Sequence, residues 1–409
     1  MSIPAPRSAP LAALYQDIRY ENGRWPLWRW DRNLRYLVKS VVHRRTPWTM
    51  EDREHHARAR AYLESGAWAR VGASPARVLA GGDLMWIRSG FRDALAPPLR
   101  ARIAAADLAV VNLETPIDPE RPVPRLVYET LHYNSPPEYL DAWRSARACA
   151  VSLCNNHALD QGREGLRRTR DLIEGLGLEV LGGVDPGDAI GAARAGDLAV
   201  GLTALTYDVN HLHGAPPAGI PVARFGDPTH EPDWRRIAAQ ITAARLAGSD
   251  LVILVAHWGF EYEYWPAATQ RAHAKRLIEL GVDVILGSSP HVLQPVEVVS
   301  VDGADPACPS QATRGGPPRF ALIAWSLGNL ATIMPTLPCR TGALLEIDVG
   351  RDARGVPAFS ALRAIPTVSA RGLGASWLDG ATLPAEPGDP HHAHARAMLG
   401  ALVDPKGLR

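Results

Sequence analysis

Side chains able to bind a metal follow apolar runs at five places in the sequence. The five motifs are Gly81-Gly82-Asp83, Asn112-Leu113-Glu114, Cys154-Asn155-Asn156-His157, Ala256-His257-Trp258 and Gly287-Ser288-Ser289-Pro290-His291. One Asp after two glycines is ordinarily a turn residue, but five such positions in one register are hard to explain as turns. Because sites of α/β proteins assemble at the carboxyl ends of strands, the spacing predicts one shared site with metal-binding and acid–base chemistry.

The apolar runs before these motifs predict the strands that position them. Predicted strands span residues 77–80, 108–111, 150–153, 179–181, 198–202, 251–255, 282–286, 319–324 and 343–349. Several runs are apolar throughout, as in strands that are covered on both faces. Between them, residues 162–176 and 269–280 carry apolar side chains at helical spacing. This alternation predicts a layered α/β domain.

Composition divides the chain into three zones. They are an N-terminal extension rich in Trp and Arg (1–75), a catalytic domain (76–350) and a wrapping tail rich in Pro and Gly (351–409). In the extension, Thr49 followed by Asp52 predicts a capping box that opens a helix. Because this helix is rich in charged residues, His55 and His56 are expected on its surface. In the tail, His391, His392 and His394 are expected to be solvated.

The overall composition excludes several classes of protein. The chain has 409 residues, a formal net charge of +1 and four cysteines without paired C-x-x-C spacing. These features exclude a disulfide framework and give no sign of a nucleic-acid partner. The N-terminus lacks the apolar core of a signal peptide, and no apolar run approaches the ~18 residues of a membrane span. We therefore expect a cytoplasmic protein with no membrane partner.

The ordered motif set resembles that of a known enzyme family. The segments GGDLMW, DLAVVNLETPI, CNNHALDQG, AHWGFEYEYWP, GVDVILGSSPHVLQPVE and AWSLGNL are similar to those of the CapA (poly-γ-glutamate capsule synthesis) family. That family belongs to the calcineurin-like metallophosphatase superfamily. The resemblance covers about residues 78–333 and implies an α/β sandwich of two sheets flanked by helices, with metal ligands on the connecting loops.

The resemblance also implies roles for individual residues. The implied metal ligands are Asp83, Glu114, Asn156, His257 and His291. His157 corresponds to the general acid or base of the asparagine–histidine motif. The motifs depart from the pattern of two-metal phosphoesterases at Met85 and Ser289, where His is expected. Since the remaining ligands are mainly hard oxygens, we expect one oxygen-preferring divalent cation, such as Ca²⁺, Mn²⁺ or Mg²⁺.

Histidines that are not needed as ligands become available for proton transfer. The candidates are His157 with Asp160, and His291 or His257 with Asp83. Two such pairs flanking one carbon could remove a proton from one face and return it to the other. The resemblance to the lasso-peptide epimerases of this branch therefore implies Cα epimerisation of a residue in a ribosomal precursor peptide. The alternative is a metal-dependent hydrolase of the polyglutamate or phosphoester class, and a third hypothesis is a binding module without catalysis.

Further residues near the motifs are candidates for contacts around the site. The predicted substrate contacts are Trp86, Trp258, Glu261 and Asn155, and the residues predicted to support the ligands are Asn112 and Asn329.

Overall fold

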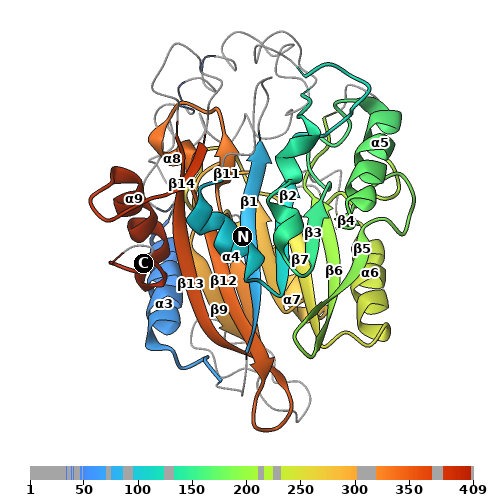
Figure 1. The fold of residues 1–409 in the computed structure, drawn as a ribbon. Coiled ribbons are helices and arrows are strands. Elements are labelled where there is room, and N and C mark those ends of the chain that lie inside the picture. Colours follow the sequence, from blue (N-terminus) through green and yellow to red (C-terminus); the bar gives the residue numbers. More distant parts are fainter. Residues whose placement is uncertain are drawn as a thin grey trace, which may run out of the picture.

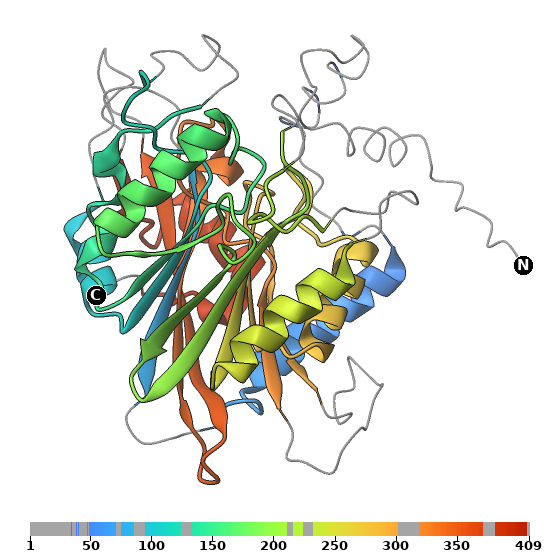
Figure 2. The same cartoon turned by 90° about the vertical axis from the view of Figure 1, so that its right-hand side faces the viewer.

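The computed structural model of the chain describes residues 49–70, 75–85, 95–123, 133–210, 216–223, 232–301, 319–370 and 381–406, with positions 34, 38, 40 and 47. These residues form two β-sheets that lie face to face and are flanked by helices (Figures 1 and 2). The predicted α/β sandwich of two sheets is therefore confirmed.

The first sheet has eight strands among the described residues, in the order β14-β13-β12-β1-β2-β3-β4, with β11 paired to β1. Its strands are β1 (Ala76–Met85), β2 (Leu108–Leu113), β3 (Cys149–Ser152), β4 (Glu179–Leu181), β11 (Asn329–Thr332), β12 (Thr341–Arg351), β13 (Pro357–Ala370) and β14 (Ala381–Pro384). Strands β1 to β4 are parallel, so their carboxyl ends meet at one edge.

The second sheet has six strands in the described part of the chain, in the order β5-β6-β7-β8-β10-β9. They are β5 (Ile190–Ala195), β6 (Leu198–Thr206), β7 (Leu251–His257), β8 (Val284–Ser288), β9 (Val296–Ser300) and β10 (Phe320–Ala324). Strands β6, β7, β8 and β10 are parallel, whereas the edge strands β5 and β9 are antiparallel to their neighbours.

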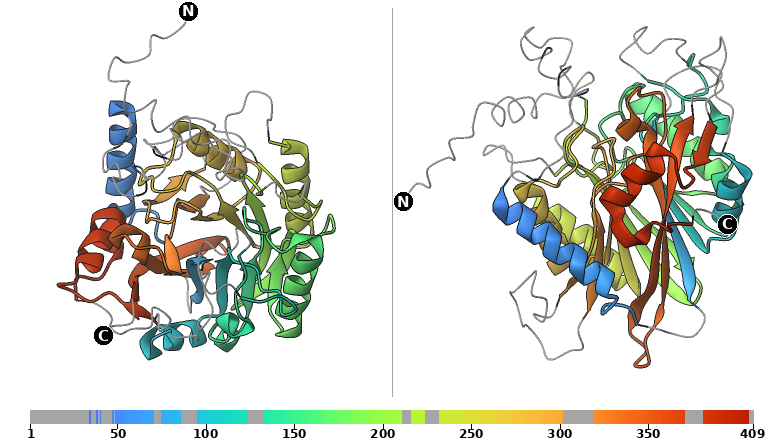
Figure 3. Two further views of the ribbon diagram at one scale, coloured as in Figure 1. Left: turned by 90° about the horizontal axis from the view of Figure 1, so that it is seen from above. Right: turned by 90° about the vertical axis from the view of Figure 1, so that its left-hand side faces the viewer.

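Helices cover the outer faces of the two sheets (Figures 2 and 3). They are α3 (Met50–Ser65), α4 (Pro97–Ala104), α5 (Gly162–Gly175), α6 (Trp234–Leu246), α7 (Ala268–Glu279), α8 (Leu337–Arg340) and α9 (Pro390–Leu399), with short 3₁₀ turns at η2 (Pro137–Leu140), η3 (Trp143–Ser145) and η5 (Gly400–Leu402). Helices α6 and α7 pack on the second sheet, while α5 packs beside β4.

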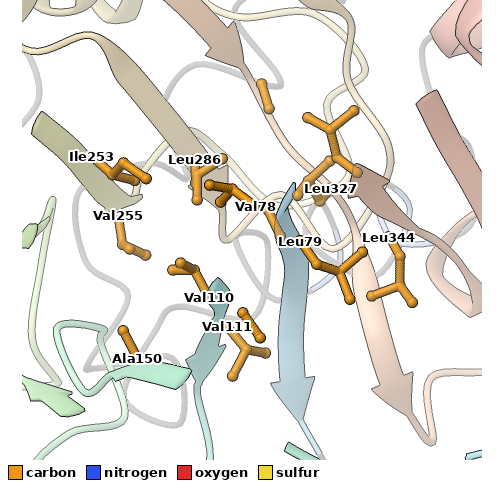
Figure 4. Close-up of a cluster of buried hydrophobic side chains, with 14 of the residues drawn as sticks. Val78, Leu79, Val110, Val111, Ala150, Ile253, Val255, Leu286, Leu327 and Leu344 are labelled. Carbon is orange, nitrogen blue, oxygen red and sulfur yellow. The ribbon is translucent and has the colours of Figure 1, made fainter. Parts of the chain in front are cut away.

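The strand β7 shows why these apolar runs are continuous. Ile253 and Val255 point into the core between the sheets, where they meet Val78 and Val110 of the first sheet (Figure 4). Leu254 belongs to the layer under α6 and α7. Both faces of the strand are thus covered, and each fully buried aliphatic side chain contributes about 1.5–3 kcal/mol to folding.

The C-terminal segment adds regular structure that the sequence did not predict. Strand β13 pairs with β12 from Thr341 to Arg351, and β14 then pairs with β13. The expectation of solvated histidines in this segment is wrong. His391 and His392 are buried, with the His391 ring 2.6 Å from the Thr341 hydroxyl. The His394 ring packs against Tyr264.

Helix α3 begins as the sequence predicted. The Thr49 amide donates to the Asp52 carboxylate and the Asp52 amide donates to the Thr49 hydroxyl, both over 3.0 Å, which confirms the capping box. The prediction that His55 and His56 lie on the surface is wrong for His56, which is buried, whereas His55 is partly exposed. Helix α3 packs on β9, and both rings contact the buried Glu297.

The close approach of β1 to the turn before β11 leads to a prediction about stability. A Cβ placed on Gly82 would lie 1.9 Å from the backbone oxygen of Gly328. We expect Gly82→Ala to lower the free energy of unfolding by about 3 kcal/mol or more, measured by urea denaturation. The control is Gly175→Ala, because nothing lies within 4 Å of a Cβ at this exposed end of α5. Equal stability of Gly82→Ala and the natural chain would contradict the close contact.

Candidate metal centre

The strand registers bring the predicted motifs to one end of the sandwich, the end that Figure 3 (left) views from above. In the first sheet, Asp83 of β1 lies opposite Asn112 of β2 and Asn329 of β11. In the second sheet, His257 of β7 lies opposite Ser288 of β8. Side chains that are far apart in the sequence therefore meet where the parallel strands end, as the strand-end argument predicted.

Two carboxylates and two imidazoles form the centre of this cluster. His291 lies 3.8 Å from Asp83 through Nδ1 and 3.7 Å from Glu114 through Nε2. His257 lies 3.7 Å from Asp83 through Nδ1 and 3.5 Å from Glu114 through Nε2. One ligand atom from each of Asp83, Glu114 and His291 falls within 4.8 Å of the others. All four side chains are buried.

Hydrogen bonds from neighbouring residues orient the cluster. The Asn112 side-chain amide donates to Asp83 Oδ1 over 2.7 Å, and the Ser289 backbone amide donates to Asp83 Oδ2 over 2.9 Å. The His291 Nδ1 lies 2.9 Å from Asn329 Oδ1, so it donates there and leaves Nε2 directed toward Glu114. Asn112 and Asn329 thus lie where the sequence placed them, beside predicted ligands.

The loop after β8 has an unusual backbone. Ser289 has a φ of 96° and His291 a φ of 57°, both in the left-handed region that side chains other than glycine rarely adopt. Such conformations persist only where the surrounding structure enforces them, and they concentrate at functional sites. Here the conformation directs the Ser289 amide, rather than its side chain, at Asp83.

The electrostatics of the two carboxylates call for a positive charge. Burial, together with the nearby Asp83 and Glu261, raises the pKa of Glu114 well above its ordinary value. Burial also pushes the pKa of Asp83 upward, but contacts with His257 and His291 and the Ser289 amide outweigh it and lower the pKa. Neither Glu114 oxygen has a hydrogen-bond partner among the described residues. A divalent cation would supply that partner, so the donor set fits one.

His257 has the properties of a neutral ligand. Burial lowers its pKa, which Asp83 only partly offsets, so the ring keeps a lone pair. Its Nε2 lies 2.9 Å from Asn156 Oδ1, and its Nδ1 lies 3.1 Å from the Ser288 hydroxyl. The structure therefore brings all five predicted ligands, Asn156 included, into one contact network.

A histidine–carboxylate pair lies beside the cluster. His157 Nδ1 is 2.7 Å from Asp160 Oδ2, and the same oxygen accepts from the Tyr133 backbone amide over 2.9 Å. The Tyr133 ring packs on the His157 ring at 4.6 Å. Asn210 was not predicted; its side-chain nitrogen lies 3.4 Å from His157 Nδ1, and its backbone amide donates to Asn156. No motif signalled Asn210, because it follows a strand that carries no other site residue.

Comparison with known proteins places this site in a family. The family of bacterial capsule synthesis proteins, PGA_cap, matches residues 44–333, more than half of the chain. The chain belongs to the PGA_cap family. The match spans every residue of the cluster and the His157–Asp160 pair.

Curated proteins that are similar to the chain share limited identity with it. A probable polyglutamine synthesis accessory protein of Mycobacterium tuberculosis is 30% identical over 210 residues, which cover 47% of this chain and 52% of that protein. The PGA biosynthesis protein CapA of Bacillus subtilis is 26% identical over 255 residues, covering 61% and 60%. The chain thus spans between half and two thirds of the length of these relatives.

The similarity to solved structures is lower. A phosphatase of Mycoplasma pneumoniae has 12% identity and a TM-score of 0.40, with 72% of this chain and 94% of that chain covered. A putative 5'-nucleotidase of Staphylococcus aureus has 11% identity and a TM-score of 0.38, covering 73% and 56%. Among the described residues of this PGA_cap chain, no helix is both long and apolar enough to cross a membrane.

Two of the predicted substrate contacts are corrected by the structure. Trp258 is fully buried, donates from Nε1 to the Trp325 backbone oxygen over 3.0 Å and stacks on the Trp325 ring, so it packs the core under α6 and α7. Asn155 is also fully buried, and its amide bonds to the backbone of Leu113 and His157.

Glu261 is half-buried and close enough to Glu114 to affect its pKa. Trp86 lies outside the described residues.

Proposed function

We propose that the chain is a metal-dependent hydrolase of the PGA_cap family that cleaves an amide bond in a peptide or polyglutamyl substrate. The observation that carries the proposal is the His157–Asp160 pair beside a buried carboxylate–imidazole cluster, in which the Glu114 oxygens have no hydrogen-bond partner among the described residues. Together these groups provide a place for a cation and a separate group for proton transfer. Membership of a capsule synthesis family supports the polyglutamyl choice.

In this proposal, one group of residues binds the cation and another transfers protons. Asp83, Glu114 and His291, with His257 and Asn156 beside them, would hold one divalent cation. When bound, such a cation polarises a carbonyl oxygen and lowers the pKa of water.

His157 supplies the acid–base chemistry in this scheme. Asp160 accepts from its Nδ1–H, which fixes the tautomer and leaves Nε2 to take a proton from the attacking water and return it to the leaving nitrogen. The Tyr133 backbone amide holds Asp160 in place for this task.

Cα epimerisation of a precursor peptide is the second candidate. It shares with hydrolysis the use of one cation, which fits Ser289, because this residue offers Asp83 a backbone amide and places no imidazole in the cluster. It needs a second acid–base pair, however. The predicted partners of Asp83 are His291 and His257. His291 Nδ1 lies 3.8 Å away and bonds to Asn329 instead, and His257 Nδ1 lies 3.7 Å away, closer to the Ser288 hydroxyl at 3.1 Å. This geometry suits a ligand better than a base, and for that reason we place hydrolysis first.

Isotope labelling distinguishes the two candidates in one experiment. The full chain is incubated with Ca²⁺, Mn²⁺ or Mg²⁺ and either poly-γ-glutamate or a precursor peptide, in H₂¹⁸O and in D₂O. Hydrolysis yields shorter products with ¹⁸O in a new carboxyl group. Epimerisation yields a peptide of unchanged length with one deuterium at an α-carbon. The absence of both products with every cation would overturn the enzyme proposal in favour of a binding module.

Removing the proposed acid–base group should separate turnover from metal binding. We expect His157→Asn to lower kcat by about 10²–10⁴-fold and to flatten the pH profile, because the proton carrier is lost. Metal affinity, measured by titration calorimetry, should stay unchanged. The control is His273→Asn in α7, whose ring contacts Tyr207 outside the cluster and which should retain full activity. Normal turnover by His157→Asn would rule out His157 as the proton carrier.

A further inference from the structure

A second cluster of metal-competent side chains lies outside the proposed active site. His55 and His56 on α3 converge on Glu297 of β9, although more than two hundred residues separate them in the sequence. His55 Nε2 lies 3.1 Å from one carboxylate oxygen and His56 Nδ1 lies 3.0 Å from the other. One ligand atom from each residue falls within 4.8 Å of the other two.

The surroundings of this cluster are largely closed to water. The side chains of His56 and Glu297 are 5% and 2% exposed, whereas that of His55 is 22% exposed, so access from solvent is on the His55 side. The Trp265 ring packs on the His56 ring at 4.8 Å. Arg271 of α7 bonds to Asp52 over 2.6 Å and so fixes α3 independently of the two histidines.

We propose that His55, His56 and Glu297 form a second metal site, for an ion of the zinc class, that fastens α3 to the edge strand β9. Two imidazoles and one carboxylate are a donor set that Zn²⁺ accepts, with water in a fourth position. Water can reach that position from the His55 side. Nitrogen makes up two of the three donors here, whereas the active-site cluster adds oxygens of Asp83, Glu114 and Asn156 to its two imidazoles and so favours harder cations.

The same distances would also suit hydrogen bonds from the two rings to Glu297 without a metal. The two arrangements make different use of the ring nitrogens. A zinc ion takes a lone pair from each ring, whereas hydrogen bonding requires a proton on each of the same nitrogens. Metal binding at the cluster therefore decides between them, independently of any assay of enzyme activity.

The test measures zinc bound per chain after free metal is removed. It compares the full chain with Glu297→Gln, His55→Ala, Asp83→Asn and Asp52→Asn. We expect Glu297→Gln and His55→Ala to lose one equivalent of zinc, with affinity at this site about 100-fold weaker or more. Asp83→Asn and Asp52→Asn should keep that equivalent, because neither change touches the three ligands. Asp52→Asn is the matched control, since it weakens the other attachment of α3.

A second measurement keeps the proposal falsifiable if a variant folds poorly. Zinc should raise the Tm of the full chain by more than that of Glu297→Gln, a substitution that preserves size and shape and leaves the active-site cluster able to bind a cation. Cobalt in place of zinc should give the visible absorption of a four-coordinate ion in the full chain only. Equal zinc content in the full chain, Glu297→Gln and His55→Ala would overturn the proposal and assign the cluster to hydrogen bonding.

Discussion

Asp83→Asn is expected to lower metal-dependent turnover by about 10³-fold, a loss of several kcal/mol of transition-state stabilisation. The carboxylate of Asp83 lies at the centre of the cluster, 3.7 Å from His257 and 3.8 Å from His291. An amide at this position keeps the shape of the side chain but removes the charge that attracts a divalent cation. The measurement is initial rate against cation concentration, with metal content determined on the same samples.

A matched carboxylate elsewhere in the first sheet provides the control for Asp83. Asp348 of β12 pairs with Arg77 on the partly exposed side of the sheet, so Asp348→Asn should leave turnover unchanged. An Asp83→Asn protein that binds the cation and turns over at the normal rate would remove Asp83 from the proposed mechanism.

Glu114→Gln is expected to have opposite effects on stability with and without metal. Without metal, the natural chain buries a carboxylate that has no hydrogen-bond partner among the described residues, and the variant should be more stable at neutral pH by about 1 kcal/mol or more. With metal at 100 times its Kd, the natural chain should gain about 2.7 kcal/mol, whereas the variant should gain little. In urea unfolding, Glu114→Gln should therefore be the more stable protein without metal, and the natural chain should be the more stable protein with metal.

The pH dependence of the metal-free chain follows from the same carboxyl group. Because burial raises the pKa of Glu114 in the folded state, the folded protein holds its proton more tightly than the unfolded chain does. The stability contributed by Glu114 is fully present below its unfolded pKa of about 4.3 and is lost as the pH rises through the folded pKa. The slope approaches about 1.4 kcal/mol per pH unit in that window.

Urea unfolding at a series of pH values, in a chelator, tests this prediction. The difference between the natural chain and Glu114→Gln isolates the contribution of Glu114 from that of Asp83 and the histidines. A difference that stays constant with pH would show that Glu114 does not carry the raised pKa.

Most of the layered fold and the convergence of the cluster could be predicted from local patterns. Runs such as the one that forms β7 are apolar on both faces, and this identifies a strand between two layers. Ligand-type side chains at the ends of parallel strands then have to meet, as Asp83, Glu114 and His291 do. Their roles as metal ligands remain predictions.

The features that could not be predicted from the sequence depend on contacts between segments that are far apart in the chain. Strand β13 has no distinctive pattern of its own and is specified by its pairing with β12. His56 looked exposed because its helix is rich in charged residues, and only the packing of α3 on β9 reveals its contact with Glu297. Trp258 follows the predicted ligand His257 in the sequence, yet it points into the core on the other side of the second sheet. A sequence motif does not indicate in which direction the side chain next to a predicted ligand points.

The donors of the candidate centre come from both layers of the sandwich, Asp83 and Glu114 from the first and His257 and His291 from the second. An ion bound there would therefore link the two sheets. A shift of one sheet relative to the other would change the distances between the donor atoms. Release of the ion and separation of the two sheets are therefore coupled. Slower backbone hydrogen exchange in both sheets on adding the cation, including strands remote from the cluster, would be the visible sign of that linkage.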